Sequence, residues 1–178
     1  PIPMSFVGYA TKAVLILEFS PTIISVVLAG KVGSYITSSI GTMRVTEQID
    51  ALDIMGVNSA NLLILPKILA SLVFNPLLIA ISIVFGIWGG YLAGIGTGSW
   101  SAADYITGIQ MYMPSHFIWY AFFKTAVFAF LIATIPAYFG YNVKGGSLEV
   151  GRASTQAVVW TIVAVIITNL VLTQMFLS

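Results

Sequence analysis

Four long apolar stretches dominate this sequence, and each is long enough to cross a lipid bilayer. A membrane-spanning helix needs about 20 consecutive, mostly apolar residues. The stretches cover residues 13–40, 68–95, 117–139 and 153–176. Only 7% of the residues are charged, whereas a soluble domain carries about 25%. The sequence therefore predicts an all-α polytopic membrane protein with four membrane helices, in which residues 1–178 form a single domain.

The few charged and reactive residues exclude several classes of function. Seven Lys and Arg residues stand against six Asp and Glu residues, and a net charge of +1 gives no basic surface for nucleic acid. With no Cys and one His, a Cys-based or His-rich metal site is excluded. No glycine stands at the P-loop spacing before Gly30-Lys31, so the chain alone is not expected to hydrolyse ATP. We expect no catalytic residues and no cofactor bound by this chain itself.

Basic residues set the expected orientation in the membrane. Five of them lie in or beside the first and third links between the apolar stretches: Lys31, Arg44, Lys67, Lys144 and Arg152. The opposite side holds only Lys12, with Lys124 set aside as intramembrane. Because Lys and Arg concentrate on the cytoplasmic side, the first and third links are predicted to be cytoplasmic. The sequence begins Pro1-Ile2-Pro3 without Met, so we interpret it as a fragment with one helix missing upstream.

The first link contains a charged segment with helical periodicity. Four charged residues lie between Arg44 and Asp53, and the acids Glu47, Asp50 and Asp53 recur at every third position. Apolar residues follow helical spacing on the other side: Val45, Ile49, Leu52 and Met55. This pattern predicts an amphipathic helix.

The ends of this charged helix also have sequence signals. Thr46 is predicted to cap its start and Gly56 to end it, which gives a helix over about residues 46–55. Two interpretations of the helix stay open. It is either a solvated loop helix between two membrane helices or a docking surface for a soluble partner.

The second link predicts a short helix on the outer face of the membrane. Ser101 and Asp104 resemble a capping box. Three apolar residues follow at helical spacing: Ile106, Ile109 and Met113. A surface helix over about residues 101–113 is therefore expected. Five nearby aromatic residues are interpreted as anchors in the headgroup region: Trp100, Tyr105, Tyr112, Trp119 and Tyr120.

Small residues repeat every four positions in the first two apolar stretches. Such stripes let helix backbones approach closely in lipid. The glycines expected to make these contacts are Gly33 and Gly41 in the first stretch and Gly86, Gly90 and Gly94 in the second. The partner helix could belong to the same chain or to another copy. Pro21, Pro76 and Pro136 are expected to bend or locally open their helices.

Three polar residues interrupt the apolar stretches. Glu18, Lys124 and Asn169 all fall in the outer third of the membrane by counting helical turns. A charge within the bilayer costs about 2.5 to 3.5 kcal/mol on insertion scales, so each needs a partner or a wet cavity. We predict that Glu18 and Lys124 neutralise each other, with Asn169 as a nearby hydrogen-bond partner. The pair could fix helix packing alone or contact a substrate.

Several motifs follow one another along the chain: EFSP (18–21), AGKVGS (29–34), GTMRVTEQIDAL (41–52), LPK (65–67), GIWGG (86–90), KTAVF (124–128) and GG…VGRAST (145–155). In these motifs, over essentially its whole length, the sequence resembles the MlaE-like permeases of MCE-type ABC lipid transporters. The resemblance implies five membrane helices after an N-terminal interfacial helix, so this chain would lack that element and the first membrane helix.

The same resemblance implies partners and a cargo. We expect a homodimer in the bacterial inner membrane, a cytoplasmic ATPase that supplies ATP and Mg, and a periplasmic MCE-domain protein. Together they would move phospholipid or related lipids between the inner and outer membranes. The alternative is a secondary transporter in which Glu18 and Lys124 relay ions or protons, although the sequence shows no inverted repeat. A structural membrane scaffold is a further rival.

The resemblance also gives roles to the polar residues. The charged helix would couple to the ATPase through Arg44, Glu47, Gln48, Asp50, Leu52 and Asp53. Glu18, Lys124 and Asn169 would border a lipid cavity at the permease dimer interface. Two positions depart from the family pattern, because Leu17 replaces a frequent Arg and Asn169 replaces an Asp found in some members. A cavity with fewer charges is therefore expected here.

Overall fold

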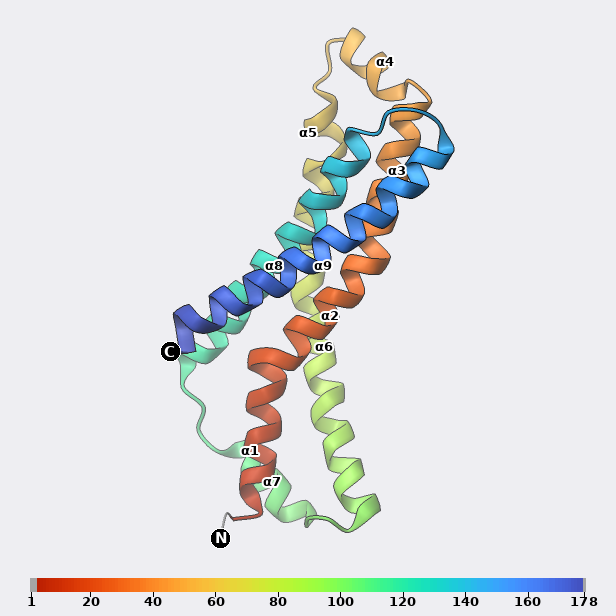
Figure 1. Cartoon of the computed structure of the whole chain (residues 1–178). Coiled ribbons are helices and arrows are strands. Elements are labelled where there is room, and N and C mark those ends of the chain that lie inside the picture. The colour runs from red at the N-terminus through yellow and green to blue at the C-terminus, as the bar shows by residue number, and fades with distance from the viewer. Residues whose placement is uncertain (1–2, 178) are drawn as a thin grey trace.

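The computed structural model describes residues 3–177, and all regular secondary structure in this range is helical (Figure 1). The elements are α1 (Ser5–Val14), η1 (Leu15–Phe19), α2 (Ser20–Leu28), η2 (Ala29–Gly33), α3 (Ser34–Val45), α4 (Gln48–Ile54), α5 (Ser59–Leu63), α6 (Leu65–Thr97), α7 (Ala102–Gln110), α8 (Ser115–Tyr141) and α9 (Ser147–Leu177). The two η elements are single π-helical turns.

Four helical segments are long and apolar enough to cross a membrane, as the sequence predicts. They are Ser5–Val45, Ser59–Thr97, Ser115–Tyr141 and Ser147–Phe176. The chain is thus an all-α polytopic membrane protein. Each segment extends beyond the apolar stretch that predicts it, because backbone hydrogen bonding continues past the point where apolar residues give way to polar ones.

The four segments run in alternating directions (Figure 1). One end of the bundle carries α4 and α5, and the other carries α7; we call these the α4 end and the α7 end. Elements α1 to α3 form one continuous helix of 41 residues, about 60 Å long at 1.5 Å per residue. This helix is longer than the roughly 30 Å hydrocarbon core, so it must project beyond the bilayer or cross it at a tilt.

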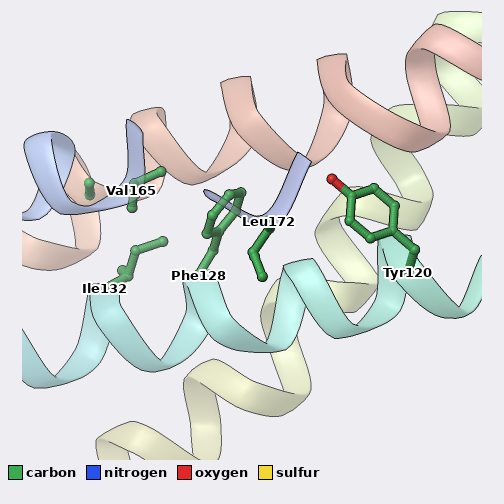
Figure 2. Packing of buried hydrophobic residues seen from close by; sticks show 6 residues of the cluster. Tyr120, Phe128, Ile132, Val165 and Leu172 are labelled. Carbon is green, nitrogen blue, oxygen red and sulfur yellow. The ribbon is translucent and has the colours of Figure 1, made fainter. Parts of the chain in front are cut away.

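Helix α8 lies at the centre and packs against α3, α6 and α9. Figure 2 shows Tyr120, Phe128 and Ile132 of α8 beside Val165 and Leu172 of α9. All five are buried, together with Ala29 of η2. A second buried cluster at the α4 end joins α3, α4 and α8 through Ile36, Ile40, Ile49 and Ala137. The amphipathic face of α4 is thereby docked on the bundle through Ile49.

Glycines of the first stripe lie at helix contacts within the chain. A Cβ added to Gly33 would lie 3.2 Å from Pro136 of α8, and one added to Gly41 would lie 3.1 Å from Val150 of α9. Close approach of η2 to α8 and of α3 to α9 therefore depends on these two small residues.

The glycine stripe of α6 also lies at contacts within the chain. A Cβ added to Gly86, Gly90 or Gly94 would meet side chains from outside α6. Their partners, in the same order, are Leu15, Tyr105 and Trp100. The stripe makes room for a leucine and two aromatic rings, which explains why Tyr105 is fully buried instead of anchoring in the headgroup region.

Helix α7 begins as the sequence predicts. The Ser101 hydroxyl oxygen accepts a hydrogen bond from the Asp104 backbone N–H (3.1 Å), although the helix ends at Gln110, before the expected limit. Its last turn is held by Lys12, whose Nζ donates to the carbonyls of Ile109 (2.8 Å) and Met111 (2.6 Å). A cation at a helix C-terminus also complements the helix dipole.

Candidate functional site

The predicted intramembrane ion pair is present in the structure. Lys124 Nζ lies 2.8 Å from Glu18 Oε1. The Lys124 side chain is completely buried, whereas the Glu18 side chain remains 37% exposed. The Thr173 hydroxyl of α9 also donates to Glu18 Oε1 at 2.8 Å. Three membrane segments, carrying η1, α8 and α9, therefore meet at one carboxylate.

The π-helical turn that contains Glu18 explains a further contact of Lys124. In an α-helix the Leu17 carbonyl accepts from the residue four positions on, which is Pro21 and has no N–H. Lys124 Nζ donates to this carbonyl at 3.0 Å. The opening expected at Pro21 is thus used to satisfy a buried ammonium group, which would otherwise be costly in the membrane.

Aromatic rings complete the surroundings of Lys124. Its Nζ lies 5.3 Å from the centre of the Tyr120 ring and 6.0 Å from that of Phe128, within the range of cation–π attraction. The Tyr120 hydroxyl lies 3.2 Å from Thr173 Oγ1. Tyr120 is buried, so its interpretation as an interface anchor is wrong; its hydroxyl has a protein partner and its ring covers a cation.

Asn169 lies in the same cluster. Thr22 Oγ1, about one turn after Glu18 in the same helix, donates to Asn169 Oδ1 at 3.2 Å. We call Glu18, Lys124, Thr173 and Asn169 the polar cluster. Sequence reasoning identified three of these residues but missed Thr173, because a threonine in an apolar helix carries no signal of a distant partner.

The polar cluster has an asymmetric exposure. The cation is enclosed, while Glu18 and Asn169 are only partly buried. A half-exposed carboxylate in a membrane helix needs a polar environment on its open side. The cluster can therefore present a fixed carboxylate and an amide to a wet cavity or to another protein surface. In the part of the chain that the structure describes, no three His, Cys, Asp or Glu residues gather as a metal site.

The charged segment of the first link forms α4, which begins later than expected. Thr46 does not cap it: its hydroxyl donates back to the Thr42 carbonyl at 2.9 Å, at the end of α3. Glu47 stands at the N-cap position with a left-handed backbone, φ 62°, which is uncommon for a residue other than Gly. This turn, formed by Thr46 and Glu47, lets the chain leave α3 at Val45 and begin α4 at Gln48. Gly56, at φ +79°, ends the segment as predicted.

Two of the expected coupling residues hold α4 in place. Arg44 Nη1 lies 2.9 Å from Asp50 Oδ1, and the Arg44 guanidinium lies 5.5 Å from the centre of the Tyr141 ring. The Tyr141 hydroxyl is 2.8 Å from Ser59 Oγ in α5. Together these contacts connect α3, α4 and α5 to the end of α8.

The other residues expected to couple to an ATPase lie on the surface. Glu47, Gln48 and Asp53 are exposed and Leu52 is half-buried. Two further apolar side chains, which were not assigned to coupling, are strongly exposed: Ile54 is 86% exposed and Met55 is 68% exposed. We call Glu47, Gln48, Asp53, Ile54 and Met55 the α4 tip. It combines acids with accessible apolar area, a composition suited to binding another protein.

Comparison with known proteins identifies the family. A family model described as "Permease MlaE" matches residues 3–175 of this chain. A probable ABC transporter permease protein of Rickettsia bellii is 38% identical over 94% of this chain and 65% of its own length. The intermembrane phospholipid transport system permease protein MlaE of Haemophilus influenzae is 29% identical over 93% of the chain and 64% of its own length.

A plant protein is also similar. TRIGALACTOSYLDIACYLGLYCEROL 1, chloroplastic, of Arabidopsis thaliana is 33% identical over 89% of the chain and 45% of its own length. The chain thus spans about two thirds of the Rickettsia and Haemophilus relatives and less of the plant relative. With a family match over nearly its whole length and a four-helix membrane fold, the chain belongs to the MlaE permease family of ABC transporter permeases.

Proposed function

We propose that this chain is part of the permease subunit of an ABC transporter that moves phospholipid or related lipids between the inner and outer membranes of a bacterium. The permease would act as a homodimer in the inner membrane, with an ATPase that binds ATP and Mg and an MCE-domain protein on the other side. The name of the Haemophilus relative, which refers to intermembrane phospholipid transport, supports the cargo.

One observation carries the proposal: a single helix runs from Glu18 of the polar cluster to Val45, two residues before the α4 tip. Glu18 and Val45 belong to the same continuous helix, about 40 Å apart at 1.5 Å per residue. A push on the tip would therefore reach η1 along one helix, through the π-helical turn η2. The buried Ile49 side chain and the Arg44–Asp50 ion pair hold α4 on the bundle, so the tip would move with the bundle.

In this proposal the α4 tip docks on the ATPase. Closure of the ATPase dimer would press on α4 and tilt the helix from Ser5 to Val45. Glu18 and Asn169 would line the lipid cavity between two permeases, where their open sides could meet headgroups. The complete burial of Lys124 favours this role over a proton or ion relay, since a relay residue needs a wet path.

The docking step is tested by placing a charge on the tip without disturbing the bundle. Ile54→Asp changes a side chain that is 86% exposed, so folding should be unaffected while ATPase co-purification falls at least tenfold. The matched control is Leu148→Asp, a 69% exposed apolar residue of α9 near the same end. Co-purification at wild-type yield with Ile54→Asp would refute docking through the tip.

A further inference from the structure

A narrow groove at the α4 end has no role in the proposal above. It lies between the segment from α2 to α3 and helix α6, and has a volume of about 250 Å³. Its walls are mainly apolar, with Leu28 and Val32 on one side and Phe74 and Leu78 on the other. Phe74 and Leu78 are exposed, so the groove is open on the outer surface of the helix bundle.

An unpaired amide lies in this groove. Asn75 is only 5% exposed, and its Nδ2 has no hydrogen-bond partner among the residues that the structure describes. A buried donor without an acceptor is unfavourable, and more so where no water can replace the missing partner. The neighbouring polar residue Ser71 does not meet this need, because its hydroxyl donates to the Ala129 carbonyl of α8 at 2.9 Å.

The mouth of the groove is positively charged. Lys67, in the first turn of α6, lines it and places Nζ 5.6 Å from the centre of the Tyr35 ring. Within the described residues no carboxylate pairs with Lys67. Lys31 lies one turn before Tyr35, in an adjoining cleft that also contains Ser34 and Ser38. Two cations therefore flank one exposed tyrosine.

The length of the groove suits one leaflet. It extends along α6 from Lys67 to Leu78, about 16 Å at 1.5 Å per residue, and half of the hydrocarbon core is about 15 Å. Along this path the cation comes first, Ser71 and Phe74 follow, and the Asn75 amide lies eight residues from Lys67, about 12 Å along the helix axis, with Leu78 beyond it. A glycerophospholipid drawn into the groove would place its phosphate at the cation and its ester carbonyls and chains deeper, toward the amide.

We propose that this groove binds one anionic glycerophospholipid from the leaflet at the α4 end. Lys67 contacts the phosphate, the Asn75 amide donates to an ester carbonyl, and an acyl chain lies against Leu28 and Phe74. The site is separate from the polar cluster, because Glu18 lies 17 residues before Tyr35 in the same helix. It requires neither an ATPase nor transport, so it stands or falls independently of the proposed function.

The test uses a fluorescent label on a single cysteine, since the chain has no Cys of its own. Leu77→Cys, at an exposed position of α6 that does not line the groove, is labelled and the protein is reconstituted in vesicles with chain-brominated phosphatidylglycerol or chain-brominated phosphatidylcholine as quencher. We expect phosphatidylglycerol to occupy the site about fivefold more strongly, the effect of one lysine near an anionic lipid. The matched position Leu92→Cys, 49% exposed near the other end of α6, should show no preference.

Two substitutions test the Lys67 contact and the Asn75 contact separately. Lys67→Met should remove the preference for phosphatidylglycerol, whereas Lys144→Met, at the same end but outside the groove, should keep it. Asn75→Leu should weaken the binding of both lipids by about fivefold, since both lipids carry ester carbonyls.

Three results would overturn the proposal. The first is equal loss of preference with Lys144→Met, which would indicate a general surface charge. The second is unchanged quenching with Asn75→Leu. The third is no quenching by either lipid in the wild-type background, which would mean that another part of the protein covers the groove.

Discussion

The polar cluster and the α4 tip both contain charged residues, but the cation of the cluster is enclosed and paired whereas the acids of the tip are exposed. In the cluster the Lys124 ammonium is fully enclosed and bonded to Glu18 and to the Leu17 carbonyl. At the tip, Glu47 and Asp53 are exposed and form no ion pair within the described range. Charges in lipid must be satisfied within the protein, whereas charges in water are free for a partner. The cluster is therefore built into the bundle, and the tip is available for binding.

The largest loss of stability is expected when the ion pair of the polar cluster is broken. Glu18→Gln leaves the fully buried Lys124 ammonium without its counter-charge, and an uncompensated buried charge costs about 3 to 5 kcal/mol. We expect the midpoint of thermal unfolding in detergent to fall strongly. The double variant Glu18→Gln/Lys124→Met should recover most of the loss, because neither charge is then left alone. A single variant as stable as wild type would show that the pair contributes nothing to the fold.

The next prediction compares the effect of truncating two isoleucines of α4. Ile49 is fully buried against α3 and α8, so Ile49→Ala should lower the free energy of unfolding by about 2 to 4 kcal/mol. Ile54 is 86% exposed, and Ile54→Ala should change it by less than about 0.5 kcal/mol. Chemical denaturation of both variants measures the difference. Equal losses would contradict the orientation of α4.

A smaller effect concerns the support of the tip. Tyr141→Phe removes the hydrogen bond to Ser59, which is worth about 1 kcal/mol. The ring remains beside Arg44, so α4 should stay docked. Hydrogen exchange should show faster opening of α5, with α9 unchanged as an internal control. Unaltered exchange in α5 would mean that this bond does not hold the segment.

The smallest effect is expected from the Arg44–Asp50 ion pair. Asp50 is exposed, and such pairs contribute about 0 to 1 kcal/mol. Asp50→Asn should therefore leave the unfolding midpoint nearly unchanged, and added salt should remove any difference. A loss of several kcal/mol would show that the tip is held more like the cluster.

Features that depend on composition and depth could be predicted from the sequence. Apolar length identified the four membrane segments, and the cost of charge in lipid led to the pairing of Glu18 with Lys124, now observed at 2.8 Å. Gly56 was recognisable as the end of α4, because only a residue without a side chain adopts its backbone conformation freely. These inferences need no knowledge of how the helices are arranged.

Features that depend on the packing of distant segments could not be predicted. Thr46 looked like a helix cap, but α3 continues to Val45 and Glu47 makes the turn instead. The glycines of α6 gave no sign that Tyr105 and Trp100 would fill the space beside them. The unpaired amide of Asn75 becomes visible only when its neighbours are placed. In each case the partner lies in another element, and spacing along one helix cannot identify it.

The central claim is that the α4 tip is the surface for the ATPase, and photo-crosslinking tests it most directly. A photoreactive residue in place of Ile54 should crosslink to the ATPase subunit in membranes. The same residue in place of Leu148, also exposed near the α4 end, should do so far less. A crosslink from position 148 but none from position 54 would contradict the assignment of the tip.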